Sequence, residues 1–408
     1  MTPSTTPVPV LATFADGFRF DSTAVAWARE TNWYAQTPLA DLGSLRYDVY
    51  TILRYEEAAE LMADARLAQL SAYLTYVRFF FNGPVAHWWR GLMLNQNGPG
   101  HDRLRRLTQA AIVPEAVEQL RPAMRRIANE LIDAFPANGV CEFVGAFALP
   151  YPLAVWNEWL GIPLEQRALF AQSIATLGEM FAPQPGSHAA IGKALAAASK
   201  IAARTIADRR RAPGADLISR LIAVDLDGDR LDDDELLTTV VGLPFADSSR
   251  YQLGLGMAAF VDHPQQFEQL AHEPGLAPAA VTEVLRWTPA ISAVSRIAWQ
   301  TIDFRGLHLP WGTMVTIGIA SANRDREIFG SAPFDITAQR PRPPLTFGNG
   351  PHRCLGYQVA RVEMEEAFGV LAARLREPRP AGAPAWLTTL DLCGARTLPV
   401  RFRRREAS

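Results

Sequence analysis

A short segment near the C-terminal end, residues 345–356, constrains this chain more than any other part of it. Its sequence is LTFGNGPHRCLG, which follows the pattern F-G-x-G-x-H-x-C-x-G. The patterned residues are Phe347, Gly348, Gly350, His352, Cys354 and Gly356. The segment is a glycine-rich turn that presents one sulfur atom and leads directly into a predicted helix over 357–375, where apolar residues recur at helical spacing.

Cys354 is predicted to carry the chemistry of this segment. A thiolate at the start of a helix lies near unpaired backbone N–H groups, which favour negative charge. The glycines let the backbone approach a flat cofactor closely and adopt positive φ angles where needed. A single sulfur held in this way suits an axial haem ligand better than a zinc site or a disulfide. The alternative, an inert buried cysteine, is the interpretation that fits Cys141 and Cys393.

This segment resembles the haem-binding loop of the cytochrome P450 family, and so many fixed residues at fixed spacing make the match specific. The resemblance runs from about residue 45 to the end of the chain. It implies haem b (iron protoporphyrin IX) as cofactor, with Cys354 as the iron ligand. It also implies a mainly α cytochrome P450 fold, in which a large helical domain and a small β subdomain enclose the haem. We expect a single such domain over residues 1–408, with residues 1–20 poorly ordered.

Composition limits the class of protein. A net charge of −2 with 20% charged residues argues against a nucleic-acid partner. Three widely spaced cysteines argue against a disulfide framework and for a reducing compartment. The first residues have no secretory pattern, and no run of about 18 apolar residues occurs, so no membrane span is expected. The expectation is a cytoplasmic protein of the soluble bacterial type of the family.

Helical patterns dominate the chain and agree with a mainly α fold. The predicted helices span 56–63, 102–112, 114–135, 165–180, 188–211, 234–261, 264–272, 278–286 and 356–375. Two β-rich regions, 45–53 and 294–319, predict the β subdomain. The best breaks, at 212–215 and in the acidic turn 225–234, are too short to be flexible linkers.

A glutamate and an arginine three residues apart, Glu283 and Arg286, share one face of a predicted helix. Most such pairs are ordinary solvated neighbours. The resemblance identifies this pair as the family's ExxR motif, with Arg340 as its third member. The implied role is structural, because a buried glutamate between two arginines stays ionised and fixes the chain behind the haem loop.

A second pair, His101 and Arg105, lies one helical turn apart and can donate to a carboxylate, although a plain basic helix face has the same pattern. The family places an HxxxR motif here, which binds the haem propionates. Arg296 and His352 match the other two propionate donors. The set supplies three or four cationic donors for two carboxylates, a sensible balance for a buried dianion.

Further arginines are predicted to add positive charge on the cysteine side. Members of the family receive electrons there from an acidic ferredoxin or flavodoxin, which is itself reduced by an NAD(P)H reductase. A basic surface would steer the encounter with this acidic partner. Plain solubility is the alternative explanation. These residues are Arg103, Arg106, Arg353 and Arg361.

The predicted central helix, 234–261, departs from the family. Its residues 244–248, PFADS, align with the family's Ala-Gly-x-Asp/Glu-Thr, which makes Asp247 and Ser248 the predicted catalytic acid and alcohol. Serine keeps the hydroxyl donor but lacks the methyl group that restrains a threonine rotamer. Pro244 predicts a kink. The ring of Phe245 either narrows the distal pocket, or accompanies a displaced helix with unusual dioxygen chemistry, or belongs to the core.

Aromatic residues between 66 and 98 either roof a substrate pocket or pack a loop against the core. They are Tyr73, Tyr76, Phe79, Phe80, Phe81, Trp88 and Trp89. Other pocket candidates are Phe245, Ile291, Val294 and Cys393. These residues predict a small aromatic or apolar substrate, either free or bound to a carrier protein.

The main hypothesis is a haem-thiolate monooxygenase of bacterial specialised metabolism, which uses O2 and electrons from a ferredoxin-type partner. Two alternatives stay open. Pro244 and Phe245 motivate a P450 with atypical chemistry, such as aromatic coupling, nitration or peroxide-driven oxidation. A non-catalytic haem-binding protein is the other, against which Asp247 and Ser248 argue.

Overall fold

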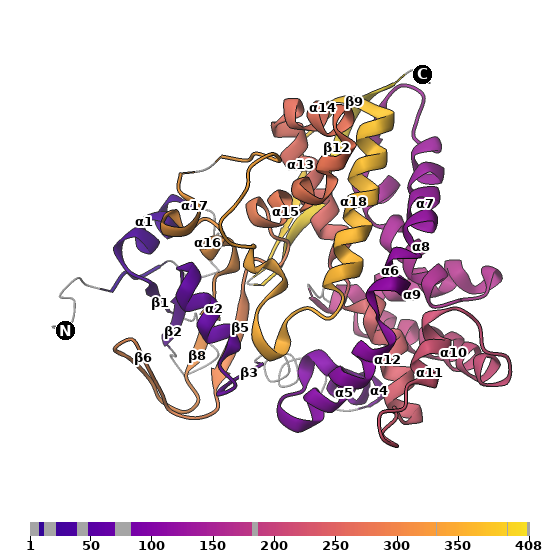
Figure 1. Ribbon diagram of the computed structural model, residues 1–408, viewed down its shortest axis with the longest axis horizontal. Coiled ribbons are helices and arrows are strands. Elements are labelled where there is room, and N and C mark those ends of the chain that lie inside the picture. Colours follow the sequence, from indigo (N-terminus) through magenta and orange to yellow (C-terminus); the bar gives the residue numbers. More distant parts are fainter. Residues whose placement is uncertain are drawn as a thin grey trace.

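The computed structural model describes residues 8–11, 22–38, 48–69, 83–181, 187–331, 333–389 and 391–405. Figure 1 shows a sheet-containing part on the side of the N-terminus and a larger helical part beside it. Most of residues 1–20, for which poor order was expected, lie outside the described residues. Within that segment, Val10 forms an isolated bridge with Gln36.

The helical part consists of helices with one buried apolar face each. The longer helices are α5 (Gly98–Ala111), α7 (Arg121–Asp133), α8 (Pro150–Trp159), α9 (Arg167–Leu177), α10 (His188–Arg211), α12 (Asp233–Phe245), α13 (Ser249–Asp262), α15 (Ala277–Trp287) and α18 (Tyr357–Arg374). The shorter ones are α1 (Thr23–Thr31), α2 (Tyr55–Ala63), α4 (Pro84–Gly91), α6 (Pro114–Glu118), α11 (Leu217–Ala223), α14 (Pro264–His272), α16 (Ile319–Ala322) and α17 (Arg326–Phe329).

The largest sheet has five strands in the order β1-β2-β8-β5-β3. These strands are β1 (Tyr34–Pro38), β2 (Asp48–Ile52), β8 (Met314–Ile317), β5 (Val294–Ala298) and β3 (Leu67–Gln69). Strands β2 and β8 pair in parallel, and the other neighbours pair antiparallel. The register places Arg296 of β5 opposite Gln69 on one side and Val315 on the other.

Among the described residues, seven short strands make up the rest of the β structure. They pair as β6 (Ile302–Phe304) with β7 (Leu307–Leu309), β10 (Ala385–Thr388) with β11 (Cys393–Thr397), and β12 (Pro399–Arg404) with both β4 (Val140–Glu142) and β9 (Leu375–Pro380). The mainly α organisation with a small β part confirms the prediction of fold class. None of the described helices is long and apolar enough to cross a membrane.

Two predicted helices are wrong as continuous elements. The helix predicted over 114–135 is two helices, α6 and α7, because Pro122 has no N–H to continue the first of them. The central helix predicted over 234–261 stops at Phe245 and restarts at Ser249. Pro244 cannot donate to the carbonyl four residues earlier, and Asp247 Oδ1 accepts the N–H of Ser249 at 2.7 Å, which stabilises the new helix start.

Helix α18 stands near the centre of the view in Figure 1, and the segment that precedes it lies between the sheet and the helical part. The helix is buried on most of its surface, including Glu363, Glu365 and Glu366. Arg121 of α7 donates to Glu365 at 2.8 Å and to Glu366 at 3.2 Å. The ion pairs anchor α18 and therefore fix the position of the loop that leads into it.

Candidate active site

The loop of residues 345–356 is closed by its own backbone and held against α2. The N–H of Cys354 donates to the carbonyl oxygen of Phe347 at 2.7 Å. Gly348 and Gly350 both have a φ of +71°, as expected for glycine. A Cβ atom at Gly350 would lie 2.5 Å from Cα of Ala63, so only glycine fits there. By contrast, Gly356 caps α18 with a φ of −84° and does not need the left-handed region.

The Cys354 thiol is desolvated but not fully covered. Burial raises its pKa to about 11, against the lowering effects of the Gly356 N–H and of the Arg105 and Arg353 guanidinium groups. In the free chain the thiol is therefore protonated at neutral pH, and the helix terminus alone does not produce the thiolate. The residue still retains accessible surface. A metal cation bound there would displace the thiol proton.

Four basic side chains, His101, Arg105, Arg296 and His352, gather on the same side as this sulfur. The ring centroids of His101 and His352 are 4.2 Å apart. Burial and the positive charges of His101, Arg296 and Arg105 lower the pKa of His352 to about 3. Burial also lowers the pKa of Arg296 to about 10. The Arg105 and Arg296 guanidinium groups therefore carry positive charge in a desolvated place, which is unfavourable unless an anion binds.

The described residues offer this cluster little negative charge. Asp102 lies 3.0 Å from His101 Nδ1, and Arg105 has no hydrogen-bond partner within the described ranges. Arg296 Nη1 donates to the neutral Gln69 Oε1 at 2.6 Å. A dianionic ligand would meet several charge-assisted donors here. The donor set thus fits the two propionates of a haem, and Cys354 would supply the ligand for its iron.

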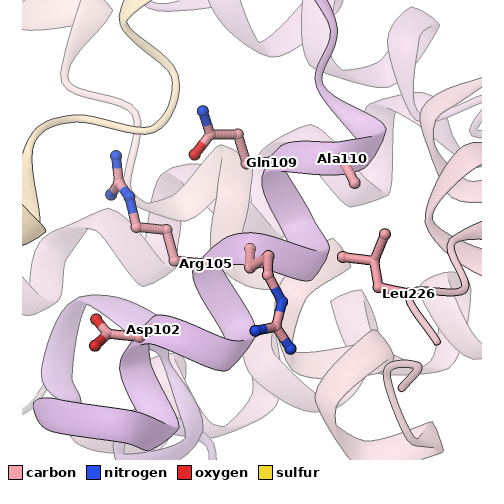
Figure 2. A pocket seen from close by; sticks show the side chains of 6 residues that line it. Asp102, Arg105, Gln109, Ala110 and Leu226 are labelled. Carbon is pink, nitrogen blue, oxygen red and sulfur yellow. The ribbon is translucent and has the colours of Figure 1, made fainter. Parts of the chain in front are cut away.

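Arg105 also lines a pocket of about 390 Å³ along α5. Figure 2 shows its side chain extending from α5 on the side away from Leu226. The other lining residues are Asp102, Arg106, Gln109, Ala110 and Leu226. Because Arg105 is close enough to Cys354 for the two groups to interact electrostatically, this pocket lies on the cysteine side of the molecule.

The arginines predicted to form a basic surface are partly neutralised. Arg103 donates to Asp229 at 2.8 Å and to Glu235 at 2.6 Å. Arg106 donates to the other oxygen of Asp229 at 3.0 Å. The guanidinium group of Arg353 instead lies over the ring of Tyr357, 4.3 Å from the ring centroid. The acidic turn therefore removes much of the free positive charge that the sequence predicted at 103 and 106.

The break between α12 and α13 contains the predicted acid and alcohol. Asp247 Oδ2 accepts the indole N–H of Trp156 at 2.7 Å, and its Oδ1 accepts the N–H of Ser249. Both oxygens are thus engaged, which fixes the carboxylate. The hydroxyl of Ser248 has no hydrogen-bond partner in the described part of the chain, and the residue is partly accessible. Its hydroxyl is free to meet a ligand.

Glu363 is a buried acid at this break that sequence reasoning missed. Its exposure is 1%. Burial and the charge of Asp247 raise its pKa well above the usual range, while a hydrogen bond with Ser249 acts in the opposite direction. Burial therefore favours the neutral form of this acid more than in an exposed glutamate. No sequence signal marks it, because a glutamate in the middle of a helix is usually exposed.

The ring of Phe245 is 2% exposed and belongs to an aromatic cluster. It meets the edges of Trp88 and Trp89 at centroid distances of 5.0 and 5.9 Å, and stacks on Phe181 at 4.9 Å. Of the three interpretations of Phe245, this arrangement agrees with packing in the core. The remaining aromatics of the predicted pocket roof lie outside the described residues; they are Tyr73, Tyr76, Phe79, Phe80 and Phe81.

The other pocket candidates come from two distant segments that the fold joins. Ile291 and Leu392 form an isolated antiparallel bridge, and the N–H of Cys393 donates to the carbonyl of Ala290 at 2.8 Å. Ile291, Val294 and Cys393 all keep accessible surface. The structure thus brings these three residues together beside β5, the strand that carries Arg296.

The predicted structural triad meets behind the loop. Arg286 donates to Glu283 with Nε at 2.8 Å and with Nη2 at 2.6 Å. Arg340 Nη2 donates to the same carboxylate at 2.6 Å, and the N–H of Asp335 donates at 3.0 Å. The side chains of Glu283 and Arg286 are 3% and 2% exposed. The carboxylate is therefore fully paired, and it ties the segment around 333–340 to α15.

Comparison with known proteins agrees with this site. The sequence model of the cytochrome P450 family matches residues 180–375. The chain is 36% identical to the luteothin monooxygenase of Streptomyces thioluteus, over 98% of this chain and 97% of that protein. It is 34% identical to the polyketide biosynthesis cytochrome P450 PksS of Bacillus subtilis, over 76% of this chain and 78% of the relative.

Solved structures show the same fold. The Bacillus subtilis P450 PksS superposes with a TM-score of 0.81 at 28% identity, covering 93% of this chain and 96% of the other. P450BioI, in complex with an acyl carrier protein ligated to hexadec-9Z-enoic acid, gives a TM-score of 0.80 at 27% identity, covering 93% and 97%. The family carries a haem, which the thiol and cation cluster above would hold. The chain belongs to the cytochrome P450 family and is a P450 monooxygenase.

Proposed function

We propose that this monooxygenase oxidises a small aromatic or apolar molecule in bacterial specialised metabolism, with O2 and electrons from a ferredoxin or flavodoxin. The observation that carries the proposal is a desolvated thiol, that of Cys354, beside a desolvated cluster of four basic side chains. The proposed cofactor is haem b, with Cys354 as its iron ligand. When bound, the haem supplies activation of dioxygen, which thiolate ligation promotes.

The chain's own residues position the reactants. His101, Arg105, Arg296 and His352 are proposed to hold the propionates and so fix the haem plane. Phe347, Gly348 and Gly356 shape the loop on the thiolate side. Ser248 is proposed to donate a hydrogen bond to dioxygen, while Asp247, fixed by the indole N–H of Trp156, is the proposed acid beside it.

The relatives support the metabolic setting and two forms of substrate. One relative is named for luteothin and another for polyketide biosynthesis, which supports an organic secondary metabolite. A solved relative holds a fatty acid ligated to an acyl carrier protein, which supports a carrier-bound substrate as the second form. We place the reaction in the cytoplasm, where reduced ferredoxin and flavodoxin are available.

The main candidate is ordinary monooxygenation rather than aromatic coupling, nitration or a peroxide-driven reaction. The atypical alternative was motivated by Pro244 and Phe245. Phe245 is packed among other aromatic rings, so its size does not by itself call for different chemistry. The break that follows Pro244 leaves the Ser248 hydroxyl available, which is the group that ordinary dioxygen activation needs.

Replacing Ser248 with alanine is expected to uncouple electron use from product formation. Without the hydroxyl donor, product formed per NAD(P)H consumed should fall about tenfold or more, with hydrogen peroxide released instead. The measurement compares peroxide and product yields for any compound that shifts the ferric Soret band. Ser248→Thr is the matched control and should stay coupled; equal coupling in Ser248→Ala and the wild type would contradict the role of Ser248.

Replacing Arg105 with glutamine is expected to weaken haem retention. One charge-assisted hydrogen bond is worth about 1.5–3 kcal/mol, so haem should be lost about 10- to 100-fold faster. Haem transfer to apomyoglobin measures the rate. Arg106→Gln is the matched control, because the Arg106 side chain, although adjacent in sequence, is 62% exposed and pairs with Asp229. Equal rates of haem loss for the two variants would contradict the propionate assignment of Arg105.

A further inference from the structure

A carboxyl group that the proposed reaction does not use, that of Asp391, lies between β10 and β11 beside the propionate side of the site. Its backbone oxygen accepts the N–H of Ser292 at 2.9 Å. Its Oδ1 accepts the hydroxyl of Ser295 at 3.4 Å. The adjacent Leu392 forms the bridge with Ile291. Three contacts therefore hold Asp391 against the segment that leads into β5.

The Asp391 carboxyl is desolvated, although the residue as a whole is not fully buried. Burial raises its pKa to about 6, against the lowering effects of the Ser295 hydrogen bond and the Arg296 charge. Its accessible neighbours along the two segments are the apolar Ile291, Val294 and Cys393.

Ser295 is the one side-chain hydrogen-bond partner of the Asp391 carboxylate among the described residues. Burial lowers the pKa of Arg296 and the charge of Asp391 acts to raise it, but the two groups share no hydrogen bond. Arg296 Nη1 donates instead to Gln69 Oε1 and to the carbonyl oxygen of Ser295. No ion pair joins Asp391 to a basic side chain among the described residues, and none of those residues donates to its Oδ2. One polar atom in an otherwise apolar wall is the usual means by which a binding site orients a ligand.

We propose that Asp391 is a specificity-determining residue that hydrogen-bonds to a hydroxyl group on an otherwise apolar substrate. A hydroxyl satisfies this group in either protonation state, because it donates to the carboxylate and accepts from the neutral acid. A hydrocarbon or an ether would leave Oδ2 of the desolvated carboxylate without a donor, which is the strongest basis for discrimination between similar ligands. This inference rests on the proposed function, and it names the substrate class.

The test uses the haem-loaded full chain and paired probes, phenylalkanols of increasing chain length and their methyl ethers. Each probe is titrated against the ferric Soret band. We expect the wild type to bind the alcohols about 10- to 100-fold more tightly than the matched ethers. Asp391→Leu should remove this preference, whereas Asp391→Asn, which still donates and accepts, should retain part of it.

Asp303→Leu is the control, because it removes an acid with an 81% exposed side chain from strand β6 of another hairpin and should keep the preference. Equal affinity of alcohols and ethers for the wild type would overturn the proposal, as would the failure of every alcohol to shift the band. If Asp391→Leu does not load haem, the comparison of the wild type with Asp391→Asn decides. A wild type without any haem-thiolate spectrum would instead contradict the proposed function.

Discussion

Replacing Cys354 with serine should abolish NAD(P)H-dependent substrate oxidation. Serine keeps the size of the side chain but offers an oxygen that is far less electron-donating than a thiolate sulfur, and thiolate donation is what promotes cleavage of dioxygen. The desolvated position also makes an ionised serine unfavourable. The expected product yield is below detection, and the haem content should fall. Product yield and haem bound per chain are the two measurements.

The other cysteines provide the controls for this result. Cys141 is buried, and burial raises its pKa to about 12, as for an inert thiol. Cys393 lies at the start of β11. Cys141→Ala and Cys393→Ser should each keep haem and measurable oxidation. Sustained turnover in Cys354→Ser, or loss of the haem signal only in a control variant, would show that the ligand has been assigned to the wrong sulfur.

Replacing Glu283 with alanine should destabilise the fold by about 3–5 kcal/mol, because the change leaves a buried guanidinium without its counter-charge. Arg286 is only 2% exposed, and Arg340 loses the same partner. The segment that precedes the Cys354 loop would lose its anchor, so haem should be lost as well. Denaturant unfolding, followed by circular dichroism, measures the change in the free energy of unfolding.

Glu130 offers a matched control on another helix. It pairs with Arg126 at 2.9 Å, but its side chain is 59% exposed. Glu130→Ala should therefore cost no more than about 0.5 kcal/mol, the usual value for an exposed pair one helical turn apart. If Glu283→Ala and Glu130→Ala shift the free energy of unfolding equally, the buried triad does not have the structural role that its geometry indicates.

The parts of the site that could be predicted from sequence are those written in short contiguous patterns. The cysteine loop holds its signal within a dozen residues, and the Glu283–Arg286 pair lies within one helical turn. The resemblance supplied the link from this pair to Arg340, and the structure places Arg340 Nη2 at 2.6 Å from the same carboxylate. The fold class followed from helical periodicity, which is strongest in long amphipathic segments such as α10.

What could not be predicted depends on neighbours that are distant in sequence. Arg103 looks free in the sequence, but the fold brings it to Asp229, 126 residues away along the chain. Asp391 gains its position through Ser295, 96 residues away. Desolvation, which raises the pKa values of Asp391 and Glu363, is a property of packing that no local pattern encodes.

The break in the central helix lies between these cases. Pro244 predicts a kink, because proline lacks the N–H that continues a helix. After a kink the chain continues the same helix in a new direction, whereas after a full break it starts a separate helix. Here the Asp247 carboxylate accepts the N–H of Ser249 and the indole N–H of Trp156, so the chain starts a new helix. The contact with Trp156 is tertiary, and sequence alone does not show it.

The central claim is that the sulfur of Cys354 is bound to haem iron. Iron X-ray absorption of the purified ferric protein tests this directly, because its fine structure reports the atoms coordinated to the metal. The account predicts one sulfur neighbour in addition to the four porphyrin nitrogens, and loss of that sulfur signal in Cys354→Ser. A wild-type spectrum that requires only nitrogen and oxygen neighbours would contradict the account.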